Sequence, residues 1–242
     1  MNSLSIYLLV CRKYLVEHKK KLLISMGGFL GICVIFGFII GINSYTSSGN
    51  FAVYLFFAGM ECSLVASRMF AETVMKEGKT SLLMIPASAA QKFFPRLVMV
   101  TLAPWILIIV GYFVYGYVSI FSYHMGFDVW VPLFNPFDGW NQRMTMALML
   151  LVSFFLLSQS LFIFGAVAWP KRSFLKTIVL MAVLLMALIF FAWLFARITH
   201  RYGVSVVVTD EMAFTWSVIT ILILMSIGIT AAAYYKFKRI TL

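Results

Sequence analysis

Six long apolar runs constrain the fold of this chain more than any other feature of its sequence. A run of about 20 apolar residues can cross the ~30 Å hydrocarbon core of a bilayer as a helix. Such a segment is helical because lipid offers its backbone no hydrogen-bond partners. The runs are Leu22–Ile42, Phe51–Ala71, Leu97–Val118, Met144–Ala168, Thr177–Ala196 and Phe214–Tyr235. The sequence therefore predicts an all-α, polytopic integral membrane protein, with six transmembrane helices forming a single domain over residues 1–242.

Composition agrees with lipid as the solvent. The 242 residues are 63% hydrophobic and 11% charged, whereas soluble domains are roughly 45–50% apolar and about 25% charged. The net charge of +11 comes from short basic clusters between the apolar runs rather than from a separate basic domain. We therefore expect membrane lipid, and not nucleic acid, as a partner.

The distribution of Lys and Arg predicts the orientation. Fifteen of the 19 lie before the first run, after the second, after the fourth or after the sixth. Three lie on the opposite side, and Arg68 falls near the inner end of the second run. Because cytoplasmic loops carry the excess of Lys and Arg, both termini are expected on the cytoplasmic side of the cell's inner (cytoplasmic) membrane.

The first 21 residues are amphipathic. Apolar side chains recur at helical spacing opposite polar and basic ones, and they are Leu4, Tyr7, Leu8, Cys11, Tyr14 and Leu15. A helix of this kind lies in the headgroup layer with its basic side toward anionic lipid. The alternative is a simple extension of the first transmembrane helix.

The segment between the third and fourth runs, residues 119–143, is unusually aromatic. Aromatic side chains suit the membrane interface, and Pro132 and Pro136 oppose a long continuous helix. The segment is predicted to be external, as a re-entrant or interfacial element. A belt anchor without a role in transport is the alternative.

Glu61 is the one acidic residue in the middle of a predicted helix. A charge there costs roughly 2.5–3.5 kcal/mol on insertion scales, so Glu61 should face protein or water, or carry a proton. Arg68 shares its helical face but lies ~10.5 Å along the axis. The sequence offers Ser63, Ser67, Gln159 and Thr220 as hydrogen-bond partners. Glu61 and Arg68 are therefore a possible intramembrane polar site, either on a substrate path or as a structural link between helices.

No catalytic constellation accompanies these features. The three histidines lie at run ends or in loops, and the chain has no HExxH, GxSxG or GxxxxGK[ST] motif. We therefore expect a protein that is not an enzyme, with no catalytic residue and no metal or cofactor of its own.

The segment 72–96 is the most informative part outside the apolar runs. Pro86 should end any helix that precedes it. Ser88 and Gln91 have the spacing of a capping box, which predicts a helix start at Ser88. The apolar stretch 82–85 is too close to charged residues to span a membrane. A compact cytoplasmic hairpin that docks a soluble partner is one interpretation, and a plain connector resting on the headgroups is the other.

The same segment resembles a known family. The layout of six helices after an amphipathic start is similar to the permease subunits of ABC-2 type transporters. So is the residue pattern of the loop that follows the second helix, carried here by Glu77, Gly78, Thr80, Leu82, Leu83, Pro86 and Ser88.

The resemblance implies a fold and a function. Such permeases form homo- or heterodimers and recruit separate ATPase subunits, which bind ATP and Mg²⁺. By position, Glu72, Glu77, Gly78, Thr80, Leu82, Leu83, Pro86 and Ser88 would lie in or beside the coupling element that contacts the ATPase. The expected function is export of an amphipathic or hydrophobic substrate, such as a lipid, peptide antibiotic, drug or glycan. The alternative is a membrane scaffold or sensor that docks a partner through the same segment.

Overall fold

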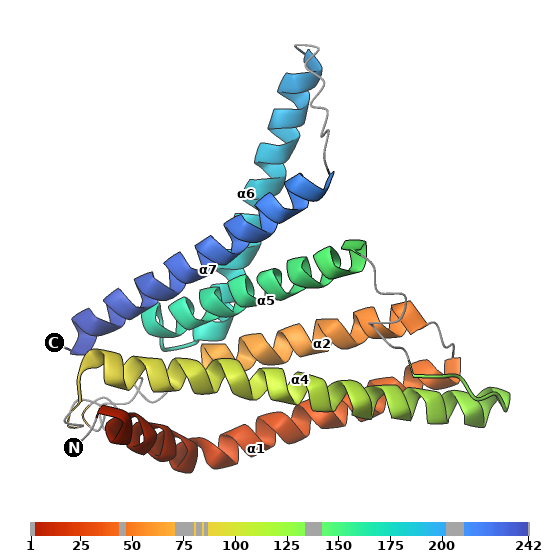
Figure 1. Cartoon of the computed structure of the whole chain (residues 1–242), viewed down its shortest axis with the longest axis horizontal. Coiled ribbons are helices and arrows are strands. Elements are labelled where there is room, and N and C mark those ends of the chain that lie inside the picture. Colours follow the sequence, from red (N-terminus) through yellow and green to blue (C-terminus); the bar gives the residue numbers. More distant parts are fainter. Residues whose placement is uncertain are drawn as a thin grey trace.

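The computed structural model describes residues 3–43, 47–70, 80, 84, 87–133, 142–201 and 211–241. Every regular element in this part of the chain is a helix, which confirms the all-α class. The helices alternate in direction, so that the start of α1 and the end of α7 lie at the same end of the molecule (Figure 1). They are α1 (Ser3–Asn43), α2 (Ser47–Ser67), α4 (Ala89–Phe127), α5 (Gln142–Ala168), α6 (Ser173–Arg201) and α7 (Glu211–Thr241).

Five of these helices contain stretches long and apolar enough to cross a membrane. The stretches are Leu22–Asn43, Ala89–Phe127, Thr145–Ala168, Ser173–Phe191 and Phe214–Ile240. In α2 the apolar stretch covers only Val53–Ser67, because polar residues open the helix and a tight turn follows Ser67. A multi-pass membrane protein is therefore indicated, but the predicted count of six spans is not confirmed.

Residues 3–43 form one continuous helix, so the amphipathic start extends the first apolar helix instead of forming a separate element. Figure 1 shows that the beginning of α1 runs at an angle to the rest of the helix. In this first part Val10 is buried, and the Cys11 thiol lies 4.0 Å from the carbonyl oxygen of Pro95. Leu8 and Leu15 are exposed. One side of the start of α1 thus packs against α4, and apolar side chains on its other side remain exposed.

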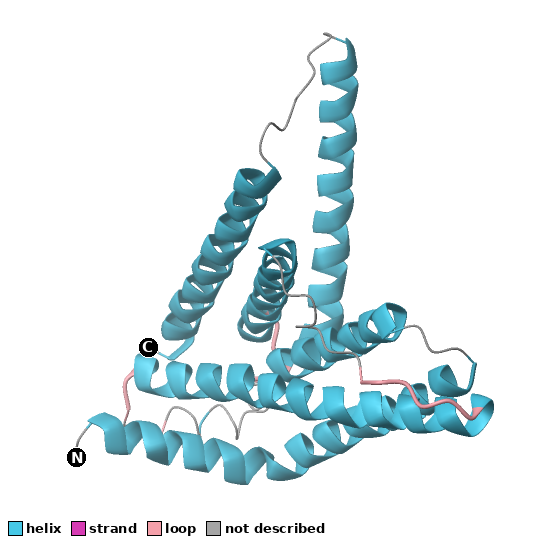
Figure 2. Ribbon diagram, turned by 45° about the vertical axis from the view of Figure 1, so that its right-hand side comes forward, coloured by secondary structure: helices cyan, strands magenta, loops and turns pink. Residues whose placement is uncertain are grey.

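The central element is α4, which contacts α1, α2 and α7. Its buried residues follow one helical face from Lys92 to Ser122. Figures 1 and 2 both show α1 beside α4 over much of its length. Small residues allow this approach: a Cβ added at Gly37 would lie 2.9 Å from the carbonyl oxygen of Tyr115. Close backbone packing of this kind is a common way for membrane helices to associate.

Both segments that flank the predicted third span are partly helical. α4 begins at Ala89, inside the predicted loop 72–96, and ends at Phe127, inside the predicted loop 119–143. The helix continues past Val118 because no strong helix breaker occurs before Asp128, which adopts a left-handed conformation (φ 52°) as the C-cap. Residues 134–141 of the external segment lie outside the described residues. The re-entrant or interfacial element predicted there therefore stays a prediction.

Candidate functional site

The beginning of α4 is fixed by the predicted capping box. The Ser88 hydroxyl accepts a hydrogen bond from the Gln91 backbone N–H at 3.3 Å. The Gln91 side-chain oxygen accepts one from the Ser88 N–H at 2.9 Å. Two amides that the first turn leaves without helical partners are thereby satisfied. The helix start predicted from Ser88 and Gln91 is confirmed. It lies inside the segment 72–96 predicted to dock a partner, and the residues that lead up to it from the end of α2 are called segment 71–87 below.

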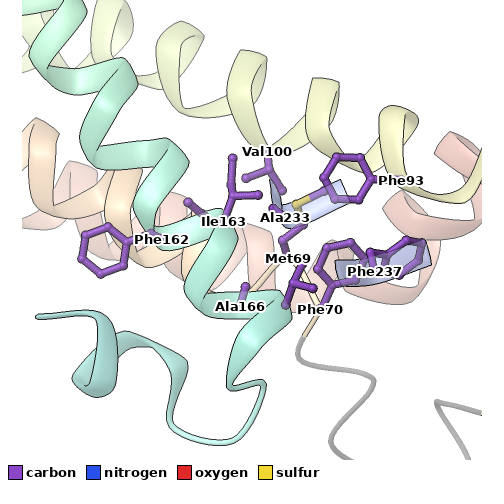
Figure 3. Packing of buried hydrophobic residues seen from close by; sticks show 11 residues of the cluster. Met69, Phe70, Phe93, Val100, Phe162, Ile163, Ala166, Ala233 and Phe237 are labelled. Carbon is purple, nitrogen blue, oxygen red and sulfur yellow. The ribbon is translucent and has the colours of Figure 1, made fainter. Parts of the chain in front are cut away.

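An aromatic cluster joins the two ends of that segment. We define it as Phe70 of the α2 end, Phe93 of α4, and Tyr234 and Phe237 of α7. The Phe70 ring lies 5.9 Å from Phe93 and 4.7 Å from Phe237, centroid to centroid, in stacked geometry. Figure 3 shows these rings together in the core. The chain therefore leaves and re-enters the helix bundle beside the same packed aromatic cluster.

The aromatic cluster belongs to a larger buried core at this end of the molecule. Ile163 and Ala166 of α5 and Val100 of α4 are buried in it (Figure 3). The Arg96 guanidinium carbon lies 5.6 Å from the Phe70 ring centroid, a cation–π distance. Dense packing transmits displacement, because interiors have low compressibility. The residues on either side of segment 71–87 thus belong to one packed core with members from α4, α5 and α7.

Two residues between the ends of the segment are described. The Met84 N–H donates to the Thr80 carbonyl at 2.9 Å, the spacing of one α-helical turn. Both residues are exposed, and Met84 is 82% exposed. An exposed apolar side chain such as that of Met84 is suited to contact with a partner. The other residues named for this role, Glu72, Glu77, Gly78, Leu82, Leu83 and Pro86, lie outside the described residues.

Glu61, the candidate intramembrane residue, is 6% exposed. Its carboxylate oxygen Oε1 accepts a hydrogen bond from the Ser25 hydroxyl of α1 at 2.7 Å. Arg68 is exposed, and no ion pair joins these two described residues. The geometry is therefore that of a polar contact between α1 and α2. The charge of Arg68 still acts on Glu61 through space, so a polar site made of these two residues stays a prediction.

The partners that the sequence offered to Glu61 were wrong. Ser63, Ser67 and Thr220 donate to carbonyls of their own helices. Gln159 donates to the Val100 carbonyl of α4. Hydropathy indicates where a helix lies but not how it is rotated, so it cannot pair side chains across helices. The sequence did contain one signal for the partner of Glu61, because Ser25 is the only hydroxyl residue in the first apolar run.

The described residues show no arrangement for metal binding. Among them, no three His, Cys, Asp or Glu side chains are placed to hold a metal ion. Cys33 and Cys62 are buried free thiols near the α1–α2 contact. The candidate site is thus defined by packing and exposure, around segment 71–87, rather than by reactive groups.

Comparison with protein-family models, with curated proteins and with solved structures finds no significant match to this chain.

Proposed function

We propose that this chain is the membrane-spanning permease subunit of an ABC-2 type exporter, driven by a separate cytoplasmic ATPase that binds ATP and Mg²⁺. The supporting observation is the aromatic cluster, which holds both ends of segment 71–87 against α7 while Met84 stands exposed between them. The resemblance of the residues from Glu77 to Ser88 to the coupling loop of that family points to the same segment.

The mechanism follows from this packing. The ATPase binds the segment at the exposed residues Thr80 and Met84, and its closure on ATP displaces the segment. The displacement reaches the ends of α2 and α4 at the same time, because Phe70 and Phe93 share one core. Rigid-body shifts of packed helices of this kind produce alternating access. The apolar helices favour an amphipathic or hydrophobic substrate, such as a lipid, peptide antibiotic, drug or glycan.

The proposal includes an assembly and an orientation. Two permease subunits, identical or different, associate with two ATPase subunits in the cytoplasmic membrane. The end of the bundle that carries the aromatic cluster faces the cytoplasm. The excess of Lys and Arg at this end supports the assignment, as does the exposure of Lys171 and Arg172 in the turn between α5 and α6.

Co-purification tests the proposal. The tagged full chain, expressed in its native host and extracted in mild detergent, should bring down a polypeptide with a phosphate-binding loop and ATPase activity. Glu77→Lys, Met84→Asp and deletion of 82–85 should each abolish this association. Met125→Asp is the matched control, because Met125 is also exposed but lies at the opposite end of α4. Normal ATPase recruitment by all three variants would refute the role of the segment.

The alternative, a scaffold or sensor, uses the same surface and is separated by the same experiment. A partner that binds through Met84 but has no ATP-hydrolysing activity favours the scaffold. ATP hydrolysis in the eluate that depends on Met84 favours the permease.

A further inference from the structure

The central helix, α4, contains a proline in its interior. α4 contains two prolines, and Pro104 is fully buried within it. Proline has no backbone N–H, so the carbonyl of Val100, one turn earlier, receives no hydrogen bond from position 104. In a bilayer, such a carbonyl is costly unless a neighbouring helix supplies a donor.

Gln159 of α5 supplies that donor. Its side-chain nitrogen Nε2 donates to the Val100 carbonyl oxygen at 3.0 Å, and both residues are buried. One turn beyond Pro104, the Tyr54 hydroxyl of α2 donates to the carbonyl of Ile108. Pro104 is thus flanked by two side-chain hydrogen bonds from two different helices.

The position of Pro104 relates it to the aromatic cluster. Ser88 begins the half of α4 that contains Phe93 and Val100, and both of these residues are buried in the same core. Gln159 lies about one turn before Phe162 and Ile163, which are in that core too. α4 and α5 are therefore joined one turn before Pro104 by a hydrogen bond and nearer the helix ends by apolar packing.

We infer that Pro104 is a hinge in α4 and that Gln159 is the positioning residue that sets its bend. The Gln159 amide satisfies the carbonyl that proline leaves open, and in doing so it ties the hinge to α5. The first half of α4 can change its angle only as this bond breaks or reforms. The use of the hinge in coupling rests on the proposed function, whereas the hinge itself does not.

A distance measurement along α4 tests the inference. Spin labels at Val98→Cys and Phe121→Cys, both exposed positions, lie about 35 Å apart along a straight helix at 1.5 Å per residue. The native cysteines Cys11, Cys33 and Cys62 are replaced by alanine. The full chain in lipid nanodiscs should give one narrow distance distribution by pulsed electron paramagnetic resonance.

Gln159→Leu should broaden or shift this distribution, because it frees the Val100 carbonyl at nearly constant volume. Gln159→Asn is the second test, used if the leucine variant fails to fold. Its shorter side chain does not reach Val100, so it should change the distance distribution in the same way. In the Pro104→Ala background the Gln159→Leu change should have no further effect, because the backbone N–H then returns to Val100.

Ser153→Ala is the matched control. Ser153 is buried on α5 but donates only to Leu150 of its own helix, so its loss should leave the distribution unchanged. An unchanged distribution in folded Gln159 variants overturns the inference. So does a Gln159→Leu effect of the same size with and without Pro104. Failure to recruit an ATPase would contradict the proposed function and leave these distances as the test of the hinge.

Discussion

In the described helices, buried and half-buried polar side chains make hydrogen bonds of two kinds. Ser63, Ser119 and Thr177 each donate to a carbonyl four residues earlier in their own helix. Such bonds satisfy the hydroxyl but do not join helices. The Ser25 bond to Glu61 instead joins α1 to α2. Removal of a side chain of the second kind leaves a buried partner unsatisfied, which is the more damaging change.

Ser25→Ala is therefore expected to destabilise the folded protein by roughly 1–3 kcal/mol, measured by reversible unfolding in detergent micelles. Ser63→Ala removes a hydroxyl that bonds only within α2 and should cost less. In a Glu61→Gln background the effect of Ser25→Ala should shrink, because a neutral acceptor is less costly to leave unpaired. Equal losses for Ser25→Ala and Ser63→Ala would show that the cross-helix bond contributes nothing.

At the level of single elements, the α1–α4 contact depends on small residues. A Cβ at Gly41 would collide with the Ser122 hydroxyl oxygen and the Ser119 carbonyl oxygen. A backbone carbonyl within a helix moves little, so the two helices would have to separate. Gly28, in the same helix, has open space at its Cβ position.

Gly41→Ala should destabilise the protein by about 1–3 kcal/mol through overpacking. Gly28→Ala should be neutral or stabilise it by roughly 0.4–1 kcal/mol, because alanine restricts the unfolded chain more than glycine does. The two variants make the same chemical change in one helix, so the difference in their unfolding free energies isolates the α1–α4 contact. Similar values for both would indicate that α1 and α4 adjust at no cost.

The cap at Ser88 makes a separate prediction. Ser88→Ala removes the hydroxyl that accepts the Gln91 N–H and should weaken the first turn of α4 by roughly 1 kcal/mol. Amide hydrogen exchange at residues 89–92 should become faster, while exchange near Gly111 stays unchanged. Ser88→Asp retains an acceptor at the cap and should preserve the protection. Unaltered exchange in Ser88→Ala would mean that Phe93 packing alone holds the turn.

Local features of these elements could be predicted from sequence, and relations between elements could not. The cap at Ser88 depends on residues three apart, and the apolar runs locate α5, α6 and α7 to within a few residues. The partner of Glu61 and the donor to Val100 depend on helix rotation, which run length does not encode. The extension of α4 to Phe127 was missed because the end of the third run was set by hydropathy alone. Hydropathy falls where polar residues appear after Val118, but a helix continues there as long as no residue breaks it.

In the whole molecule, packing is uneven along the bundle. The buried core that contains the aromatic cluster joins α2, α4, α5 and α7 near one end. α6 packs mainly on α5, with Thr177 against Gly165 and Phe174 against Phe162. Farther along, α6 diverges from the other helices (Figures 1 and 2). The unevenness thus lies mainly in α6, because a second buried core, which contains Phe29, Tyr54 and Leu107, holds α1, α2 and α4 together farther along the bundle.

The proposed function requires one orientation of the bundle, in which the end that carries the aromatic cluster faces the cytoplasm. In a chain without native cysteines, Met84→Cys and Lys171→Cys should react with a membrane-impermeant maleimide only after the cells are permeabilised. Asn43→Cys and Met125→Cys, exposed near the other ends of α1 and α4, should react in intact cells. Opposite reactivity at Asn43 and Met84 requires α2 to cross the membrane despite its short apolar stretch. If both positions react from the same side, α2 does not span the membrane, and the six-helix topology is wrong.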